Sequence, residues 1–206
     1  MDRNQFDNDF WSYYLALESK LINTATYVEF SEDNYETFSL EFAMQLQSIG
    51  SEIDTVFKEI CGFTQADRKT IAQYAPIVLE KYPQIVTQEV GLSRGGITIK
   101  PFEGWNSNNP STSLLWWANY NYLKHCRVSN FKKANLKSAL HSLAGLFILE
   151  SYWFKDICDN DGGVDIPAKR SKLFWLVNWK TRYLSGEGSF MKIIEEVPYK
   201  PKDLHN

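Results

Sequence analysis

The longest unbroken pattern in the chain is a run of apolar residues, three or four positions apart, between Phe38 and Ile60. This spacing places apolar side chains on one face of an α-helix, and it holds for more than about six turns. Asn34 or Thr37 is expected to open the helix. Gly62 supplies its stop, because glycine readily adopts the left-handed conformation at a helix C terminus. An apolar face of this length predicts that the chain packs as a helical bundle.

Four further helices are predicted from the same spacing. They cover residues 9–22, 67–79, 114–128 and a last segment from about residue 130 or 135 to residue 159. Asp7 or Asp9 is expected to cap the first of these helices, and Ser111 or Ser113 the helix at 114–128. Residues 173–179 fit a buried short helix and a strand about equally well, and we predict a helix there.

The pattern changes to period two in the middle of the chain. Val90 and Leu92 precede a Gly95–Gly96 turn, after which residues 97–100 alternate between apolar and polar side chains. This alternation around a glycine turn indicates a β-hairpin. We expect the hairpin and a polar loop to form an insertion at about residues 84–112.

The composition is that of a single folded unit. With 44% apolar and 15% aromatic residues, a chain of 206 residues has enough apolar surface for one sizeable core. The predicted fold class is therefore all-α: a helical bundle of four to six helices with a small β-hairpin insertion. We expect one domain over residues 1–206, with a C-terminal extension at about 160–206.

The cysteines and the N-terminal residues bear on cofactors and location. Cys61, Cys126 and Cys158 are odd in number, widely spaced and without accompanying histidines at zinc-site spacing. We therefore expect no disulfide framework, no metal site and no cofactor. The first residues are polar and acidic, and no stretch approaches about 18 consecutive apolar residues. These features predict a cytoplasmic protein with no membrane partner.

The net charge of -3 conceals a gradient along the chain. Residues 1–60 carry a charge of -9, residues 61–110 carry +1 and residues 111–206 carry +5. A small negative total by itself gives no sign of a nucleic-acid partner. The gradient, however, concentrates positive charge in the C-terminal half.

The most informative segment is the helix predicted at 114–128. Asn121 and His125 lie one turn apart with Lys124 beside them, so an amide, an imidazole and an ammonium group converge on one patch. A histidine there can exchange protons with the ribose and leaving oxygens of a phosphodiester, while a cation stabilises the developing charge. The alternative is a polar face whose histidine satisfies a local hydrogen bond. The buried stripe of this helix is expected to hold Leu115, Ala118, Tyr122 and Cys126.

The run Asn121-Tyr-Leu-Lys-His125 resembles the Asn-x-x-x-His half of the Arg-Asn-x-x-x-His signature of HEPN domains. Residues 116–152, with their Ala-Leu-x-x-Leu-Ala-x-Leu-Phe-x-Leu-Glu pattern, also resemble bacterial helical proteins of that type. The resemblance implies a helical bundle that forms a homodimer and cleaves RNA without a metal ion, in a toxin–antitoxin or phage-defence system. It assigns Asn121 and His125 only, because Tyr120 stands at the position of the family's arginine.

Without that arginine, Lys124 and Arg127 are the candidates to stabilise charge on a phosphate. A regular helix places Arg127 about 200° around its axis from His125, so Arg127 does not face the same way. The predicted catalytic set is His125, Asn121, Lys124 and Arg127.

Basic and aromatic residues are interleaved around this helix. We expect Lys132 and Lys133, with the rings of Trp117 and Tyr120, to bind single-stranded or looped RNA. The alternative is that the basic residues pair with the acidic N-terminal helices. Two functions stay open: a HEPN-like endoribonuclease or RNA-binding protein with an antitoxin partner, and a non-catalytic module for protein interaction or dimerisation.

Two more side chains are candidates for the same patch. His141 could meet His125 across an antiparallel helix pair as a second acid–base group, although a partly exposed helix residue is the simpler interpretation. Glu52 could orient the histidine, although a solvated helix face is the default for a lone carboxylate.

Overall fold

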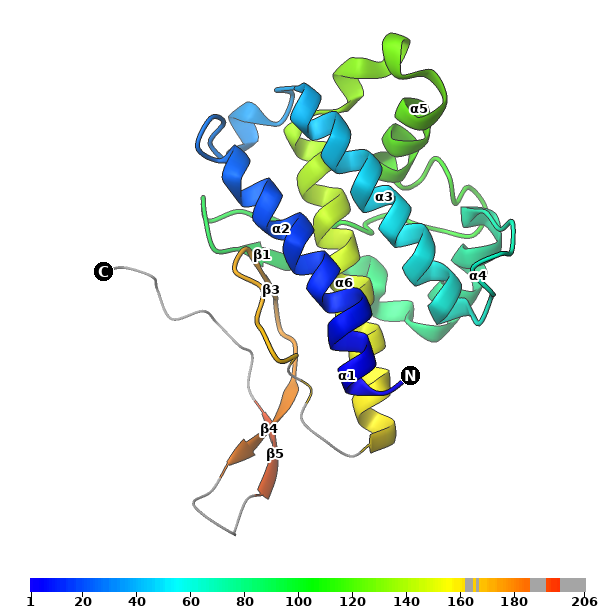
Figure 1. Cartoon of the computed structure of the whole chain (residues 1–206), viewed down its shortest axis with the longest axis vertical. Helices are drawn as coiled ribbons and strands as arrows, with labels where there is room; N and C mark the ends of the chain where they lie inside the picture. The colour runs from blue at the N-terminus through cyan, green and yellow to red at the C-terminus, as the bar shows by residue number, and fades with distance from the viewer. Residues whose placement is uncertain (162–164, 166, 186–191, 197–206) are drawn as a thin grey trace.

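The computed structural model describes residues 1–161, 165, 167–185 and 192–196 (Figure 1). Its helical segments are, in chain order, α1 (Arg3–Phe6), the π-helical turn η1 (Asp7–Trp11), α2 (Ser12–Thr24), the 3-10 turn η2 (Glu32–Asn34), α3 (Leu40–Cys61), α4 (Ile71–Lys81), the 3-10 turn η3 (Pro83–Thr87), α5 (Leu115–Asn130), the 3-10 turn η4 (Phe131–Lys133) and α6 (Leu136–Asp161). Its strands are β1 (Val90–Leu92), β2 (Thr98–Ile99), β3 (Phe174–Leu176), β4 (Thr181–Ser185) and β5 (Lys192–Glu196). The described part of the chain is mainly helical, as predicted.

Helix α6 lies at the centre of the bundle and packs against α2, α3 and α5 (Figure 1). Nearly all of its residues from Leu136 to Glu150 are buried, whichever way they face. A helix of this kind is protected from water only when neighbouring helices cover every side. Helix α3 is one of these neighbouring helices, and it buries the apolar face that its residue spacing predicted. Helices α4 and α5 pack in turn against α3.

Three helices begin at other residues than predicted, because local caps determine their first turns. The first helix begins at residue 3 rather than 9, since Asp2 accepts the backbone N–H of Gln5 (2.9 Å). Helix α3 begins at residue 40 rather than 34 or 37, since Ser39 accepts the N–H of Phe42 (3.0 Å). Helix α4 begins at residue 71 rather than 67, directly after its capping residue Thr70.

The β-hairpin is confirmed, but it belongs to a larger sheet. Strand β1 pairs antiparallel with β2, with Val90 opposite Ile99, and its other edge pairs antiparallel with β3. The helix predicted at 173–179 is therefore wrong. The carboxylate of Glu18 on α2 holds this segment by accepting the backbone N–H groups of Lys172 (3.0 Å) and Leu173 (3.1 Å).

Strands β4 and β5 form a second antiparallel pair, so the described fold is mainly helical rather than all-α. The C-terminal extension predicted at 160–206 contributes β3, β4 and β5. Its remaining parts, residues 162–164, 166, 186–191 and 197–206, lie outside the described residues. No helix in the described ranges is both long and apolar enough to cross a bilayer.

Helix α5 approaches α3 and α6 closely because glycines on those helices make room for its rings. A Cβ atom at Gly50 would lie 2.4 Å from the ring of Tyr120, and one at Gly145 would lie 3.0 Å from the indole of Trp116. The same indole donates its N–H to the carbonyl oxygen of Pro101 (2.7 Å). These contacts determine which side of α5 faces the core.

The buried stripe of α5 differs from the predicted one. Leu115 is 61% exposed and Tyr122 is 47% exposed, and Cys126 is also exposed. The residues buried instead are Trp116, Trp117, Asn119, Tyr120 and Leu123. Indole and phenol rings remove more apolar area from water than a leucine and an alanine do, so the rotation of the helix follows the rings.

Candidate functional site

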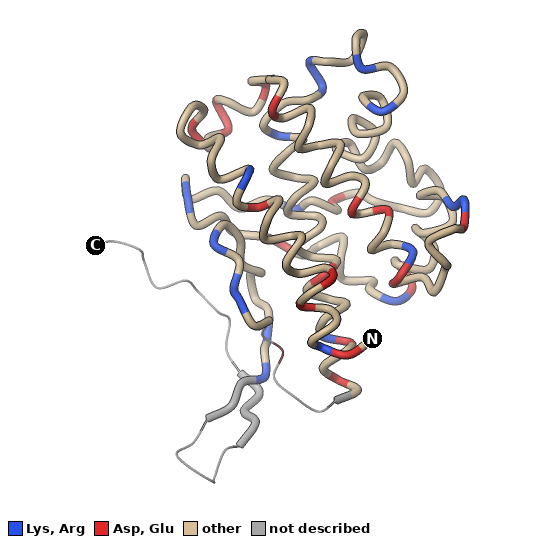
Figure 2. The backbone as a smooth tube through the Cα atoms, in the orientation of Figure 1, with Lys and Arg blue, Asp and Glu red and all other residues tan. Residues whose placement is uncertain are grey.

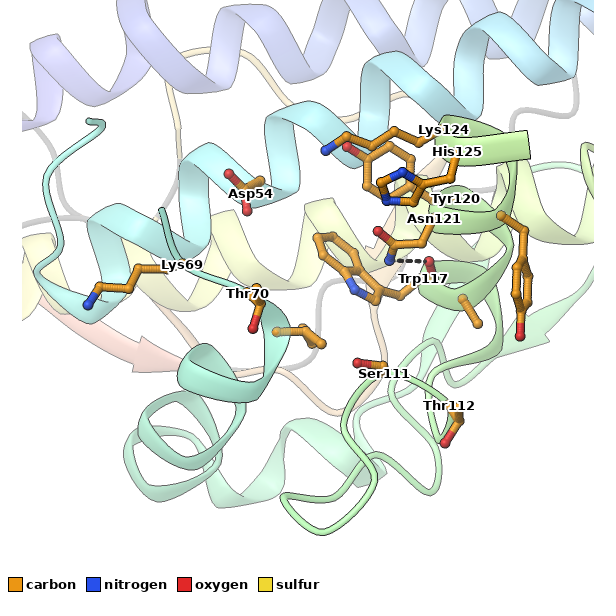
Figure 3. A pocket seen from close by; sticks show the side chains of 13 residues that line it. Asp54, Lys69, Thr70, Ser111, Thr112, Trp117, Tyr120, Asn121, Lys124 and His125 are labelled. Atoms are coloured by element: carbon orange, nitrogen blue, oxygen red, sulfur yellow. Dashed lines mark hydrogen bonds between the residues drawn. The ribbon is translucent and has the colours of Figure 1, made fainter. Parts of the chain in front are cut away.

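A pocket of about 430 Å³ lies between α5, α3 and the segment that leads into α4 (Figure 3). Its lining comes from α5 (Trp117, Ala118, Tyr120, Asn121, Tyr122, Lys124 and His125), from α3 (Asp54), from the start of α4 (Lys69, Thr70 and Ile71) and from the loop before α5 (Ser111 and Thr112). Ligand sites commonly have this size. The pocket also contains most of the residues that the sequence singled out.

The predicted group on α5 is brought together. Figure 3 shows the side chains of Asn121, Lys124 and His125 on one side of the pocket, and His125 and Lys124 are exposed. The amide nitrogen of Asn121 donates to the carbonyl oxygen of Trp117 (3.0 Å), one turn earlier on the same helix. This bond orients the amide so that its oxygen lies on the side of the imidazole ring of His125 (Figure 3).

The two aromatic rings predicted to bind RNA line the pocket from within the core. Trp117 and Tyr120 are each 4% exposed. The indole of Trp117 lies edge-on against Phe57 of α3, with ring centroids 5.8 Å apart, and the ammonium of Lys124 lies 5.5 Å from the centroid of the Tyr120 ring. The rings therefore form a rigid floor beneath the polar group rather than an exposed stacking surface.

The opposite wall contains an acidic residue that is already paired. The carboxylate of Asp54 accepts the hydroxyl of Tyr74 (3.0 Å) and forms an ion pair with Lys58 (3.1 Å). Burial and the neighbouring Asp54 raise the pKa of Tyr74 above its usual range, so the hydroxyl stays protonated and continues to donate. The negative charge on this wall is offset within α3, and Lys124 faces it across the pocket (Figure 3).

The loop before α5 closes the lower edge of the pocket. The buried indole of Trp105 donates to the carbonyl oxygen of Pro110 (3.2 Å), and this contact holds the following residues Ser111 and Thr112 beside α5 (Figure 3). A loop rich in asparagine and serine is thereby tied to the core through one ring.

The predicted cations beyond His125 are not brought into the pocket. Cys126 has non-helical backbone angles (φ -143°, ψ 62°), so α5 kinks directly after His125. Arg127 is exposed beyond this kink and does not line the pocket, nor do Lys132 and Lys133 on η4. The ammonium of Lys133 instead lies 4.7 Å from the ring centroid of Tyr122.

Positive charge dominates the end of α5 and the turn into α6. Residues 104–149 include five lysines or arginines and no aspartate or glutamate. Figure 2 shows only basic residues marked on this turn, whereas residues 1–60 carry 12 acidic and 3 basic side chains. An electropositive surface therefore adjoins the pocket.

The two additional candidates lie elsewhere. His141 packs edge-on against Tyr35, and burial together with Lys137 lowers its pKa to about 4, so the ring is neutral at pH 7. Burial raises the pKa of Glu52 to about 7. Burial and, to a smaller extent, the charge of Glu52 raise the pKa of Glu150. Neither His141 nor Glu52 lines the pocket.

Sequence reasoning did not assign to the site the six lining residues that come from other segments: Asp54, Lys69, Thr70, Ile71, Ser111 and Thr112. A signal existed for Thr70, which precedes the apolar run of α4 by one position, as a helix cap does. Nothing in the local sequence indicates that α4 begins beside α5. Only the packing of both helices on α3 brings these segments together.

The group on α5 combines an imidazole, an amide and an ammonium group at a pocket with a floor of buried aromatic rings. Such a group can bind a phosphate and transfer a proton near it. Comparison with family models, with curated proteins and with solved structures found no match to this chain. The function is therefore argued from the geometry of the pocket.

Proposed function

We propose that this HEPN-like protein binds single-stranded RNA in the pocket on α5 and cleaves its backbone without a metal ion. The observation that carries the proposal is the placement of His125, Asn121 and Lys124 on one side of the pocket, beside a stretch of chain that lacks acidic residues. Positive charge attracts the phosphate backbone of a nucleic acid independently of its sequence. The exposed imidazole then lies where such a backbone would enter.

In the proposed reaction the ribose 2′ oxygen bonds to the adjacent phosphorus, and its proton passes to the imidazole of His125. The bond between phosphorus and the 5′ oxygen breaks, and the imidazolium returns a proton to that oxygen. Lys124 stabilises the charge that builds on the phosphoryl oxygens, and Asn121 orients the imidazole. The products are a 2′,3′-cyclic phosphate and a 5′ hydroxyl. Arg127 does not line the pocket, so Lys124 is the predicted cation that does, and Lys69 before α4 is a second lysine of the lining.

The setting of this proposal is a bacterial toxin–antitoxin or phage-defence system, as the HEPN resemblance implies. A homodimer is the proposed working form, and an antitoxin protein the proposed regulator. Both belong to the proposal together with the activity.

The test is cleavage of a 5′-labelled single-stranded RNA in the presence of EDTA. We expect the wild type to produce fragments with 2′,3′-cyclic phosphate ends and His125→Ala to produce none. His141→Gln is the matched control, because it changes a histidine that does not line the pocket, and its cleavage should equal that of the wild type. Uncut RNA, or equal cleavage by His125→Ala, overturns the proposal.

A second candidate function is a non-catalytic module for protein interaction or dimerisation. The observation that favours it is Tyr120, which occupies the position of the family's arginine and packs against Gly50 in the core. Analytical ultracentrifugation tests this alternative. A stable dimer that binds no RNA would support the module and contradict the nuclease.

A further inference from the structure

The surface beside the pocket carries two pairs in which a lysine covers an exposed aromatic ring. The ammonium of Lys133 lies 4.7 Å from the centroid of Tyr122, and that of Lys132 lies 6.0 Å from the centroid of Phe38. These rings are 47% and 43% exposed. Each pair thus offers an aromatic face and a positive charge side by side on the surface.

These pairs lie on a firmly held part of the chain. Residues 35–39 run along the start of α6, where the N–H of Leu136 donates to Thr37 O (2.9 Å) and the N–H of Lys137 donates to Tyr35 O (3.1 Å). Phe38 also meets Phe131 of η4 edge-on, with ring centroids 5.8 Å apart. The ring of Phe38 is therefore placed against the turn between α5 and α6 by backbone and ring contacts together.

The pairs continue from the pocket without a break. Tyr122 lines the pocket and also lies under Lys133, which follows Lys132 and Phe131 on η4. Phe131 and Lys132 in turn contact Phe38. A track of contacts thus leads from the His125 pocket over Tyr122 and η4 to Phe38, and this track is defined by Phe38, Tyr122, Phe131, Lys132 and Lys133.

We propose that single-stranded RNA follows this track, with bases stacked on Tyr122 and Phe38 and with phosphates bound by Lys132 and Lys133. The inference rests on the proposed function, because it assigns a substrate class and a path to the same site. Stacking on aromatic rings combined with a cationic groove is the usual means of binding single strands without sequence preference. The kink at Cys126 turns the chain from α5 into this surface.

The charge of the η4 turn favours a nucleic acid over a protein as the occupant. This turn lies within residues 104–149, which lack acidic side chains, and it carries the adjacent cations Lys132 and Lys133, while Glu36 and Glu41 flank Phe38 at the other end of the track. A lysine that lies over a ring is able to swing to a phosphate and expose the ring face to a base. The lysine then binds a phosphate while the ring stacks on a base.

The test compares two probes, a 2′-O-methyl oligouridine of about 12 nucleotides and the 2′-O-methyl uridine dinucleotide, because the 2′-O-methyl group prevents cleavage. In Phe38→Leu the ratio of long-probe to dinucleotide affinity should fall at least about fivefold, as expected for the loss of one stacking contact. Tyr27→Leu is the matched control, since Tyr27 is an exposed ring (89%) between α2 and η2 that is not one of the residues defining the track. Its ratio should equal that of the wild type.

A second variant removes charge without touching a ring. Combined Lys132→Gln and Lys133→Gln should reduce the slope of log affinity against log salt by about 1.4 for the long probe, because two phosphate contacts are lost. In Phe38→Leu, the leucine retains apolar packing against Phe131. A circular dichroism melt of each variant confirms that it is folded.

The outcomes separate this inference from the function on which it rests. If the wild type binds neither probe, the proposed function and the track both fail. If the wild type binds the long probe and Phe38→Leu keeps the wild-type ratio, the track is wrong and the pocket stands. If Phe38→Leu instead dissociates a dimer and leaves the ratio unchanged, the surface is a protein interface and the track is wrong.

Discussion

Glu150 offers the sharpest test of the packing of the core, because its buried carboxyl group lacks hydrogen-bond partners among the described residues. Its side chain is 0% exposed, and neither of its oxygens has a hydrogen-bond partner within the described part of the protein. Burial, with a contribution from Glu52, raises the pKa of Glu150 well above its usual value. The folded protein therefore favours the protonated form of this carboxyl more strongly than the unfolded chain does.

Replacing Glu150 with methionine keeps the length of the side chain and removes the acid. The variant should be more stable than the wild type by about 1–3 kcal/mol at pH 5, the cost of a buried polar group without partners. Above the unfolded pKa, the wild type must take up a proton to fold, so its stability falls as the pH rises. The advantage of Glu150→Met should then grow by up to about 1.4 kcal/mol per pH unit towards pH 7.

The assay is urea unfolding followed by tryptophan fluorescence between pH 5 and pH 7. Glu18→Met is the matched control, because the same substitution removes a buried carboxylate that is fully used. Glu18 accepts hydrogen bonds from the hydroxyls of Tyr14 (2.7 Å) and Ser171 and from the N–H groups of Lys172 and Leu173. This control should lose about 3–5 kcal/mol. A Glu150→Met variant that is less stable than the wild type, or that shows the wild-type pH slope, refutes the reasoning.

Two further predictions follow from the core. Gly50→Ala should destabilise the protein by about 1–3 kcal/mol and weaken RNA binding, because its Cβ would displace the Tyr120 ring under the pocket. Urea unfolding measures the first effect and a binding titration the second. An unchanged midpoint of urea unfolding would contradict the packing. The wild type should become less stable as the pH falls from about 6.5 to 4, since unfolding frees a histidine whose folded pKa is lowered to about 4. The variant His141→Gln should not show this decrease. Parallel stability curves for wild type and His141→Gln over this range would contradict it.

The helices that carry the site were predictable because the signal lies in their own side chains. The apolar spacing of α3 persists from Phe42 to Ile60, so its existence did not depend on its partners. Asn121, Lys124 and His125 fall within about one turn, so any helix through them keeps them on neighbouring positions. Their grouping in one pocket follows from that spacing.

The features that sequence reasoning missed depend on contacts between distant segments. The rotation of α5 was misjudged because Gly50 and Gly145, on other helices, make the space that Tyr120 and Trp116 occupy. Strand β3 was misread as a helix because its partner β1 lies far away in the chain. Asp54 was overlooked because only the packing of α3 against α5 brings it to the pocket.

The most direct test of the central claim is an NMR spectrum of the histidine ring protons during titration with 2′-O-methyl oligouridine. The chain has three histidines, so His→Gln variants assign every signal. The account predicts that the ring signals of His125 shift as RNA fills the pocket, while those of His141, which does not line the pocket, stay in place. A titration in which the His125 signals do not move, although the RNA is bound, would contradict it.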